Sequence, residues 1–217
     1  DGFTLTDLTS YNTKHNLALS GPGKVRSNQD QICVFCHTPH AANEAAPPPL
    51  WNRHLSGAVY KPYTSSSFDA GKRVPWLDMG GSGQPGGSSQ LCLSCHDGTI
   101  ALGSVLVLNG RTDQDIAVAG TAPDGTMPAG QGAATGFTRR LGADLTNDHP
   151  ISFTYDDRLA NDDGELRRPS STPALGPHKP GDHRSLPLPD NKVECTSCHD
   201  PHLRDTGADN NKFLRLN

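Results

Sequence analysis

The six cysteines of this sequence occur in three pairs, and a histidine directly follows each pair. The motifs read C-x-x-C-H and begin at Cys33, Cys92 and Cys195. In this motif two thioether bonds join the cysteine sulfurs to a porphyrin, and the histidine ligates the iron from one face. We therefore expect three covalent c-type haems, attached at Cys33 and Cys36, Cys92 and Cys95, and Cys195 and Cys198, with His37, His96 and His199 as proximal ligands.

Other uses of paired cysteines suit this arrangement poorly. Structural zinc takes four ligands, so three pairs would leave one pair unmatched and the following histidines without a role. A thioredoxin-like redox pair needs a βαβ setting, which none of the motifs has. A disulfide between cysteines two residues apart is strained. The sequence thus favours haem over zinc, a redox dithiol or a disulfide.

The second axial ligand of each iron must come from elsewhere in the chain. Of 10 histidines, seven lie outside the motifs, whereas the chain has 2 methionines, Met79 and Met127. This excess favours bis-histidine ligation, which gives lower reduction potentials than His/Met ligation. An iron with two imidazole ligands has no open position for a substrate. We therefore expect an electron carrier and not an enzyme.

Two histidines, His40 and His202, stand three residues after a proximal histidine, each directly behind a proline. Three residues span at most about 10 Å, too little to pass around a porphyrin edge to the other face of the same iron. Each can therefore ligate only a different haem, and in doing so holds two haems close together. The alternative for both is a surface histidine beside a haem propionate.

His15 and His149 are the other candidates for axial ligands. Asn147 and Asp148 precede His149, and either could orient its ring through the second nitrogen. The remaining three, which lie in polar or Pro- and Gly-rich surroundings and are expected at the surface, are His54, His178 and His183. The complete set of candidate iron ligands is His37, His96, His199, His15, His40, His149 and His202.

Six segments resemble a known family in the same order along the chain, at residues 12–17, 32–40, 50–53, 91–99, 147–150 and 193–202. The sequence resembles the multihaem c-type cytochromes of metal-reducing microbes, most closely the four-haem extracellular type that polymerises into conducting filaments. The resemblance implies that His15, His40, His149 and His202 occupy distal positions, and that one ligand comes from the neighbouring subunit. The family usually has a fourth C-x-x-C-H beyond its Lys-Phe-Leu-Arg segment, so here four distal positions face three irons.

The preferred functional hypothesis is an extracellular electron conduit, a filament subunit that passes electrons between partner cytochromes and external acceptors. A monomeric periplasmic or cell-surface shuttle is the alternative. A nitrite or hydroxylamine reductase would need one haem without a distal ligand. Haem attachment takes place on exported chains, and the sequence begins at Asp1 without an initiator Met. We expect an exported, extracellular or surface protein.

Composition limits the partners and the core. The net charge of −4 argues against a nucleic-acid surface, and no apolar run approaches the length of a membrane span. The chain has 23 glycines and 18 prolines, so protein side chains alone would form a thin core. We therefore expect a single domain over residues 1–217, mostly irregular coil with short helices around the motifs and a core made by the haems.

The elements that must position the motifs are short. Residues 1–31 are expected to form an extended arm that contacts a neighbouring subunit. Ser88 or Ser89 could be the N-cap of a short helix carrying the second motif. Residues 100–108 fit a helix or a strand. Residues 109–148 and 156–192 are rich in Gly, Pro, Asp and Asn and are expected to be loops.

Overall fold

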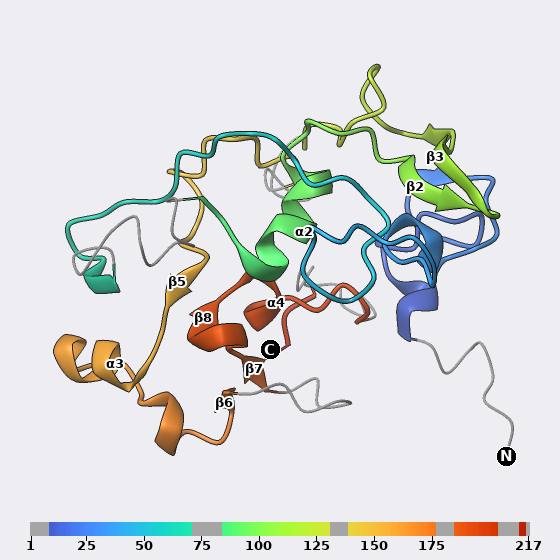
Figure 1. Ribbon diagram of the computed structural model, residues 1–217. Helices are drawn as coiled ribbons and strands as arrows, with labels where there is room; N and C mark the ends of the chain where they lie inside the picture. The colour runs from blue at the N-terminus through green and yellow to red at the C-terminus, as the bar shows by residue number, and fades with distance from the viewer. Residues whose placement is uncertain (1–8, 71–83, 131–138, 177–184, 204–212, 216–217) are drawn as a thin grey trace, which may run out of the picture. The chain divides into compact units, whose positions relative to one another are not determined.

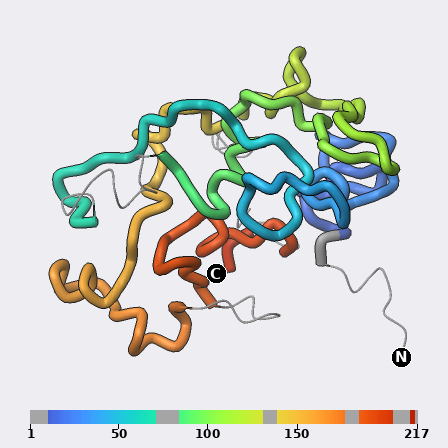
Figure 2. The backbone as a smooth tube through the Cα atoms, in the orientation of Figure 1, coloured from blue at the N-terminus to red at the C-terminus, as the bar shows by residue number. Residues whose placement is uncertain are grey.

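The computed structural model describes residues 9–70, 84–130, 139–176, 185–203 and 213–215. The chain divides into two compact units. The first is built from the described parts of residues 1–57, 91–142 and 201–213, and the second from those of residues 58–90, 143–200 and 214–217. Each unit thus brings together segments distant in sequence, as the paired blue and yellow-green segments of the first unit show (Figure 2).

The expected architecture, irregular coil with short helices around a haem core, is wrong. The described residues contain four two-stranded sheets, three antiparallel and one parallel (Figure 1): β1 (Arg26–Ser27) with β4 (Val118–Ala119), β2 (Ser104–Leu108) with β3 (Arg111–Asp115), β5 (Phe153–Thr154) with β8 (Lys192–Val193), and parallel β6 (Leu175–Gly176) with β7 (Leu186–Pro187). The described α-helices are α2 (Gly87–His96), α3 (Asp157–Asp163) and α4 (Cys195–Cys198). Single helical turns occur at η2 (Thr9–Asn12), η3 (Cys33–Phe35), η4 (Pro169–Ser171) and η5 (Pro189–Asn191). Short ladders satisfy backbone groups that a helix-poor chain would otherwise leave unpaired.

Protein side chains form a core in the first unit. Ala18, Val34 and Phe35 are buried together, and partly buried apolar residues pack against them: Leu17, Ile32, Cys36, Leu108, Ile116 and Val118. Residues 17 and 18, within the expected N-terminal arm, therefore belong to this core. Phe35 lies inside the first C-x-x-C-H motif, so the motif is fixed by apolar packing of its own side chain.

The segment at residues 100–108, which the sequence allowed to be a helix or a strand, ends in strand β2 of a hairpin. β2 pairs with β3 through the turn Asn109–Gly110, where both residues have positive φ (51° and 76°). These two residues suit the two-residue turn whose twist matches that of the flanking strands. The expectation of loops at residues 109–148 and 156–192 is wrong for β3, β4, β6, β7 and α3.

Each motif has a different local conformation. The first occupies the single turn η3, the second ends α2, and the third is α4. The helix predicted at the second motif is confirmed, but it begins at Gly87, so Ser88 and Ser89 lie inside it and are not its N-cap. Among the residues described, there is no helix with the length and apolar character needed to cross a membrane.

Candidate metal centres

Each motif histidine faces one histidine from outside its own motif. The ring centres of His37 and His202 are 6.3 Å apart, and their planes are 18° from parallel. In the second unit His199 and His149 are 6.2 Å apart at 19°. The third pair, His96 and His15, is 6.2 Å apart with its planes at 63°.

These separations have a simple interpretation in coordination chemistry. A metal–imidazole bond is about 2 Å long, and the ligating nitrogen lies about 1.2 Å from the centre of its ring. Two imidazoles on opposite faces of one metal ion therefore have ring centres about 6.3 Å apart. Aromatic rings packed directly on one another have centres about 4.5 to 7 Å apart, a range that includes these separations. All three pairs fit a metal held between two imidazoles.

Backbone carbonyls orient the rings so that one nitrogen remains for a ligand. His37 Nδ1 is 2.8 Å from Pro49 O, and His96 Nδ1 is 2.7 Å from Arg139 O. A carbonyl only accepts, so each Nδ1 donates and each Nε2 keeps its lone pair. His149 Nδ1 has a longer contact of 3.3 Å with Pro150 O. Burial and the nearby His202 hold the pKa of His37 below its ordinary value, against the opposing effect of the Pro49 hydrogen bond, which favours the neutral ligand form.

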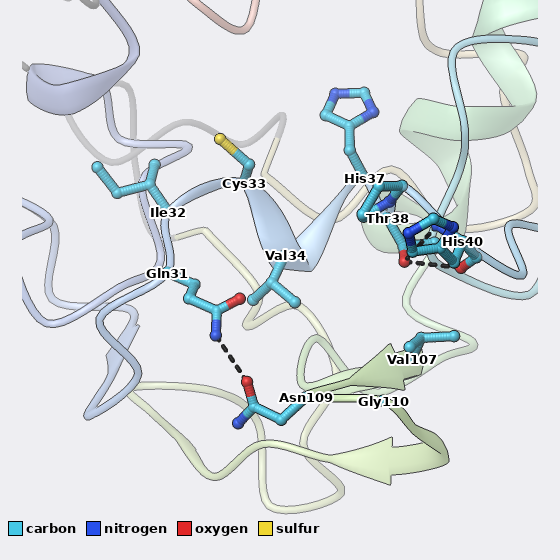
Figure 3. A pocket seen from close by; sticks show the side chains of 11 residues that line it. Gln31, Ile32, Cys33, Val34, His37, Thr38, His40, Val107, Asn109 and Gly110 are labelled. Carbon is cyan, nitrogen blue, oxygen red and sulfur yellow. Dashed lines mark hydrogen bonds between the residues drawn. The ribbon is translucent and has the colours of Figure 1, made fainter.

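The first motif borders a cavity of about 440 Å³. Cys33, Val34, His37 and His40 line it from the motif side, with Val107 from β2 opposite. In Figure 3 the rings of His37 and His40 point in different directions from their shared loop. The cavity has room for a large group joined to Cys33 and bound by His37.

His40 differs from the other three candidate distal histidines. Its side chain is exposed, as are those of His149 and His202, but its ring alone has no ring partner among the described residues. His202, at the equivalent place in the third motif, contacts His37. The structure thus brings His15, His149 and His202, but not His40, to motif histidines.

Two of the motif cysteines, Cys36 and Cys198, do not resemble activated thiols. Burial, with a further contribution from nearby Cys95, raises the pKa of Cys36 to about 12, and burial likewise raises the pKa of Cys198. Redox and nucleophilic cysteines instead have lowered pKa values. Within the described ranges, no three or more His, Cys, Asp or Glu residues gather as a cluster that could hold a bare metal ion. This arrangement fails the four-ligand requirement of structural zinc, but it suits a porphyrin, which supplies four ligands itself.

Glu194 fixes the second and third motifs from a buried position. It is 2 % exposed and is the N-cap of α4, accepting from the Ser197 N–H in a capping box. Its Oε2 also accepts from the N–H and O–H of Ser89 in α2 and from the Ser152 hydroxyl (2.9 Å). The Ser89 hydroxyl in turn accepts from Cys195 N–H (3.0 Å). One carboxylate therefore holds the first turns of both motif helices.

The segment Trp51-Asn52-Arg53 lies within residues 50–53 of the family resemblance, but its contacts with the first motif were not predicted from the sequence. Trp51 is 8 % exposed and meets the His37 ring edge to face at 5.9 Å, with its indole N–H unpartnered in the described part of the chain. Asn52 and Arg53 are fully buried. Asn52 donates its backbone N–H to Cys36 O (2.8 Å) and its side-chain amide to Val34 O (2.6 Å).

The remaining histidines lie outside these centres. His54 is exposed and 3.8 Å from Asp113 Oδ1, as expected for a surface histidine. His178, His183 and Met79 fall outside the described residues. No family model and no curated protein matches this chain.

Proposed function

We propose that the chain is an electron-transfer protein that binds three covalent c-type haems. The cysteine pairs would hold them at Cys33 and Cys36, Cys92 and Cys95, and Cys195 and Cys198. The axial pairs would be His37 with His202, His96 with His15, and His199 with His149. Bound there, each haem supplies one iron that cycles between ferric and ferrous forms.

The observation that carries this proposal is the set of three histidine pairs at 6.2–6.3 Å. Each pair joins a motif histidine to a histidine that the motif itself cannot provide. Three separate segments of the chain give the same separation, which favours a common cause over chance packing. This supports electron transfer over a reductase, because two imidazoles leave no iron position for a substrate.

Protein residues fix the orientation of the histidine rings and keep the motifs in place. The carbonyls of Pro49 and Arg139 fix the orientation of two proximal rings, and Phe35 and Glu194 anchor the motifs that carry the cysteines. Ligands fixed in this way need to move little when the charge of the metal changes. A fixed coordination shell is what an electron carrier requires.

We further propose that the protein is exported and is a subunit of an extracellular filament that passes electrons between redox partner cytochromes and external acceptors. His40 supports this assembly, because its imidazole has no ring partner among the described residues, while His15, His149 and His202 lie against motif histidines. It is the candidate ligand for an iron outside these three, held by a neighbouring subunit. A monomeric shuttle would have no such use for it.

The test is to express the chain with a haem-attachment apparatus and to record its mass and spectrum. The proposal expects a mass increase of three tetrapyrroles and six-coordinate low-spin iron at every site. Colourless protein, or a mass of 23.1 kDa for the bare polypeptide, contradicts it. Electron microscopy of the native material then separates a filament from a shuttle, since discrete particles at high concentration contradict the filament.

A further inference from the structure

Arg53 is a cation enclosed by protein. Its side chain is 0 % exposed, and Nη1 donates to Leu102 O (2.7 Å) and Ser104 O (2.9 Å). Nη2 donates to Ser94 O (3.2 Å) and Ala101 O (2.9 Å). All four acceptors are neutral carbonyls, and Nε has no partner among the residues described.

No carboxylate within the described ranges forms an ion pair with this guanidinium. Asp97, which directly follows His96, has a buried carboxylate. Its Oδ1 accepts hydrogen bonds from the N–H (2.9 Å) and the hydroxyl (2.8 Å) of Thr99. Protein atoms surround the Arg53 side chain completely. Its charge therefore acts on its surroundings through space.

Arg53 lies between the two motifs of the first unit. The preceding residue, Asn52, binds the first motif through Cys36 O and Val34 O. Arg53 itself binds Ser94 O, inside the second motif and two residues before His96. Covalent reach alone places the guanidinium on the order of 10 Å from a metal bound by His96.

We infer that Arg53 is the fixed positive charge that raises the reduction potentials of the two irons held by the pairs His37–His202 and His96–His15. This inference rests on the proposed function. Taking up one electron from a donor changes ferric to ferrous iron and adds one negative charge to the centre. A nearby cation stabilises the reduced form, and burial removes most of the solvent screening that would weaken this effect. Arg53 is a positioning charge and not a ligand.

The test is a potentiometric titration of Arg53→Met, followed by haem absorbance at fixed ionic strength. The variant keeps the volume of the stem and removes the charge. We expect two of the three one-electron steps to move to lower potential. At the wild-type midpoint the ratio of oxidised to reduced iron should rise on the order of tenfold, which corresponds to about 59 mV for one electron.

Two variants separate charge from structure. Arg111→Met removes an exposed arginine of β3 from the same unit, and it should change the ratio by less than about twofold, because water screens surface charge. Arg53→Lys keeps the charge but loses the guanidinium fork, so its potentials should stay near those of the wild type while its thermal stability falls. A purely structural arginine would not show this separation.

Unchanged potentials in a haem-loaded Arg53→Met variant overturn the inference and leave the proposed function intact. Wild-type protein without haem overturns the proposed function instead. If Arg53→Met does not take up haem, the inference is tested by NMR on the wild-type holoprotein. The Nε–H resonance of Arg53 is assigned by its absence in the Arg53→Lys variant. Slow exchange with water and a shift on reduction support the inference, whereas rapid exchange or no shift overturns it.

Discussion

Replacing His202 by alanine should change the spin state of one iron in three. In the structure its ring lies 6.3 Å from that of His37, the separation of two ligands on one metal, and the other two pairs share no residue with this one. Loss of the ring therefore opens one axial position and leaves two centres complete. The expected result is high-spin signal from about a third of the iron, with the other two thirds low-spin.

His40→Ala is the matched control, because His40 and His202 occupy the same place in C-H-x-P-H segments. In the isolated chain this variant should keep all its iron low-spin, and its effect should appear only in assembly. Resonance Raman or magnetic circular dichroism of monomeric protein at neutral pH measures both fractions. High-spin iron in His40→Ala, or fully low-spin iron in His202→Ala, would refute the assignment of these pairs.

Three further predictions concern stability. Burial raises the pKa of Glu194 above its ordinary value of 4.5, against the opposing effect of its serine hydrogen bonds. Its contribution to stability is therefore present in acid and is lost as pH rises through the raised pKa. Glu194→Gln should remove this loss in denaturant titrations from about pH 4 to about pH 8, and parallel curves would contradict it. Asn52→Ala removes one buried hydrogen bond of 2.6 Å and two partly buried ones of 2.9 Å each. This variant should lower the free energy of unfolding by about 3 kcal/mol, and a loss under about 1 kcal/mol in urea unfolding argues against the prediction. A Cβ added at Gly103 would lie 1.8 Å from Ile116 O, whereas one added at Gly57 would meet open space. Gly103→Ala should therefore cost about 2 kcal/mol by thermal unfolding and Gly57→Ala should not, so equal melting temperatures for the two variants would contradict this.

The haem attachment proposed for the motifs rests on a local sequence pattern, and it stays a prediction, whereas the ring partners of the histidines could not be predicted at all. C-x-x-C-H is a local pattern, since its function depends on a few neighbouring residues. The pairing of His37 with His202 depends on a contact between segments at opposite ends of the sequence, which no local pattern encodes. For the same reason the sequence could not distinguish His40 from His202, whose immediate surroundings are nearly identical.

Among the sheets and helix caps, those that depend on neighbouring residues could be predicted from the sequence, and those that depend on distant contacts could not. Asn109-Gly110 between an apolar and a polar run is a local signal that predicts a hairpin. The ends of α3 also carry local signals, because a short acidic side chain suits an N-cap and glycine suits the left-handed residue after a helix. Asp156 accepts from Leu159 N–H at 2.7 Å, and Gly164 has a φ of 82°. The neighbouring residues in the sequence indicate that Glu194 caps the third motif. They do not indicate its hydrogen bond to Ser89 in α2.

The bond between Glu194 and Ser89 has a consequence for the order of events during maturation. The two residues are 105 positions apart, so during synthesis from the N-terminus the second motif emerges long before the carboxylate that completes the first turn of its helix. On the proposed function, an attachment enzyme would need Cys92 and Cys95 in accessible chain. Because Glu194 is synthesised later, these cysteines would be open to modification before the bond to Ser89 fixes the first turn of their helix.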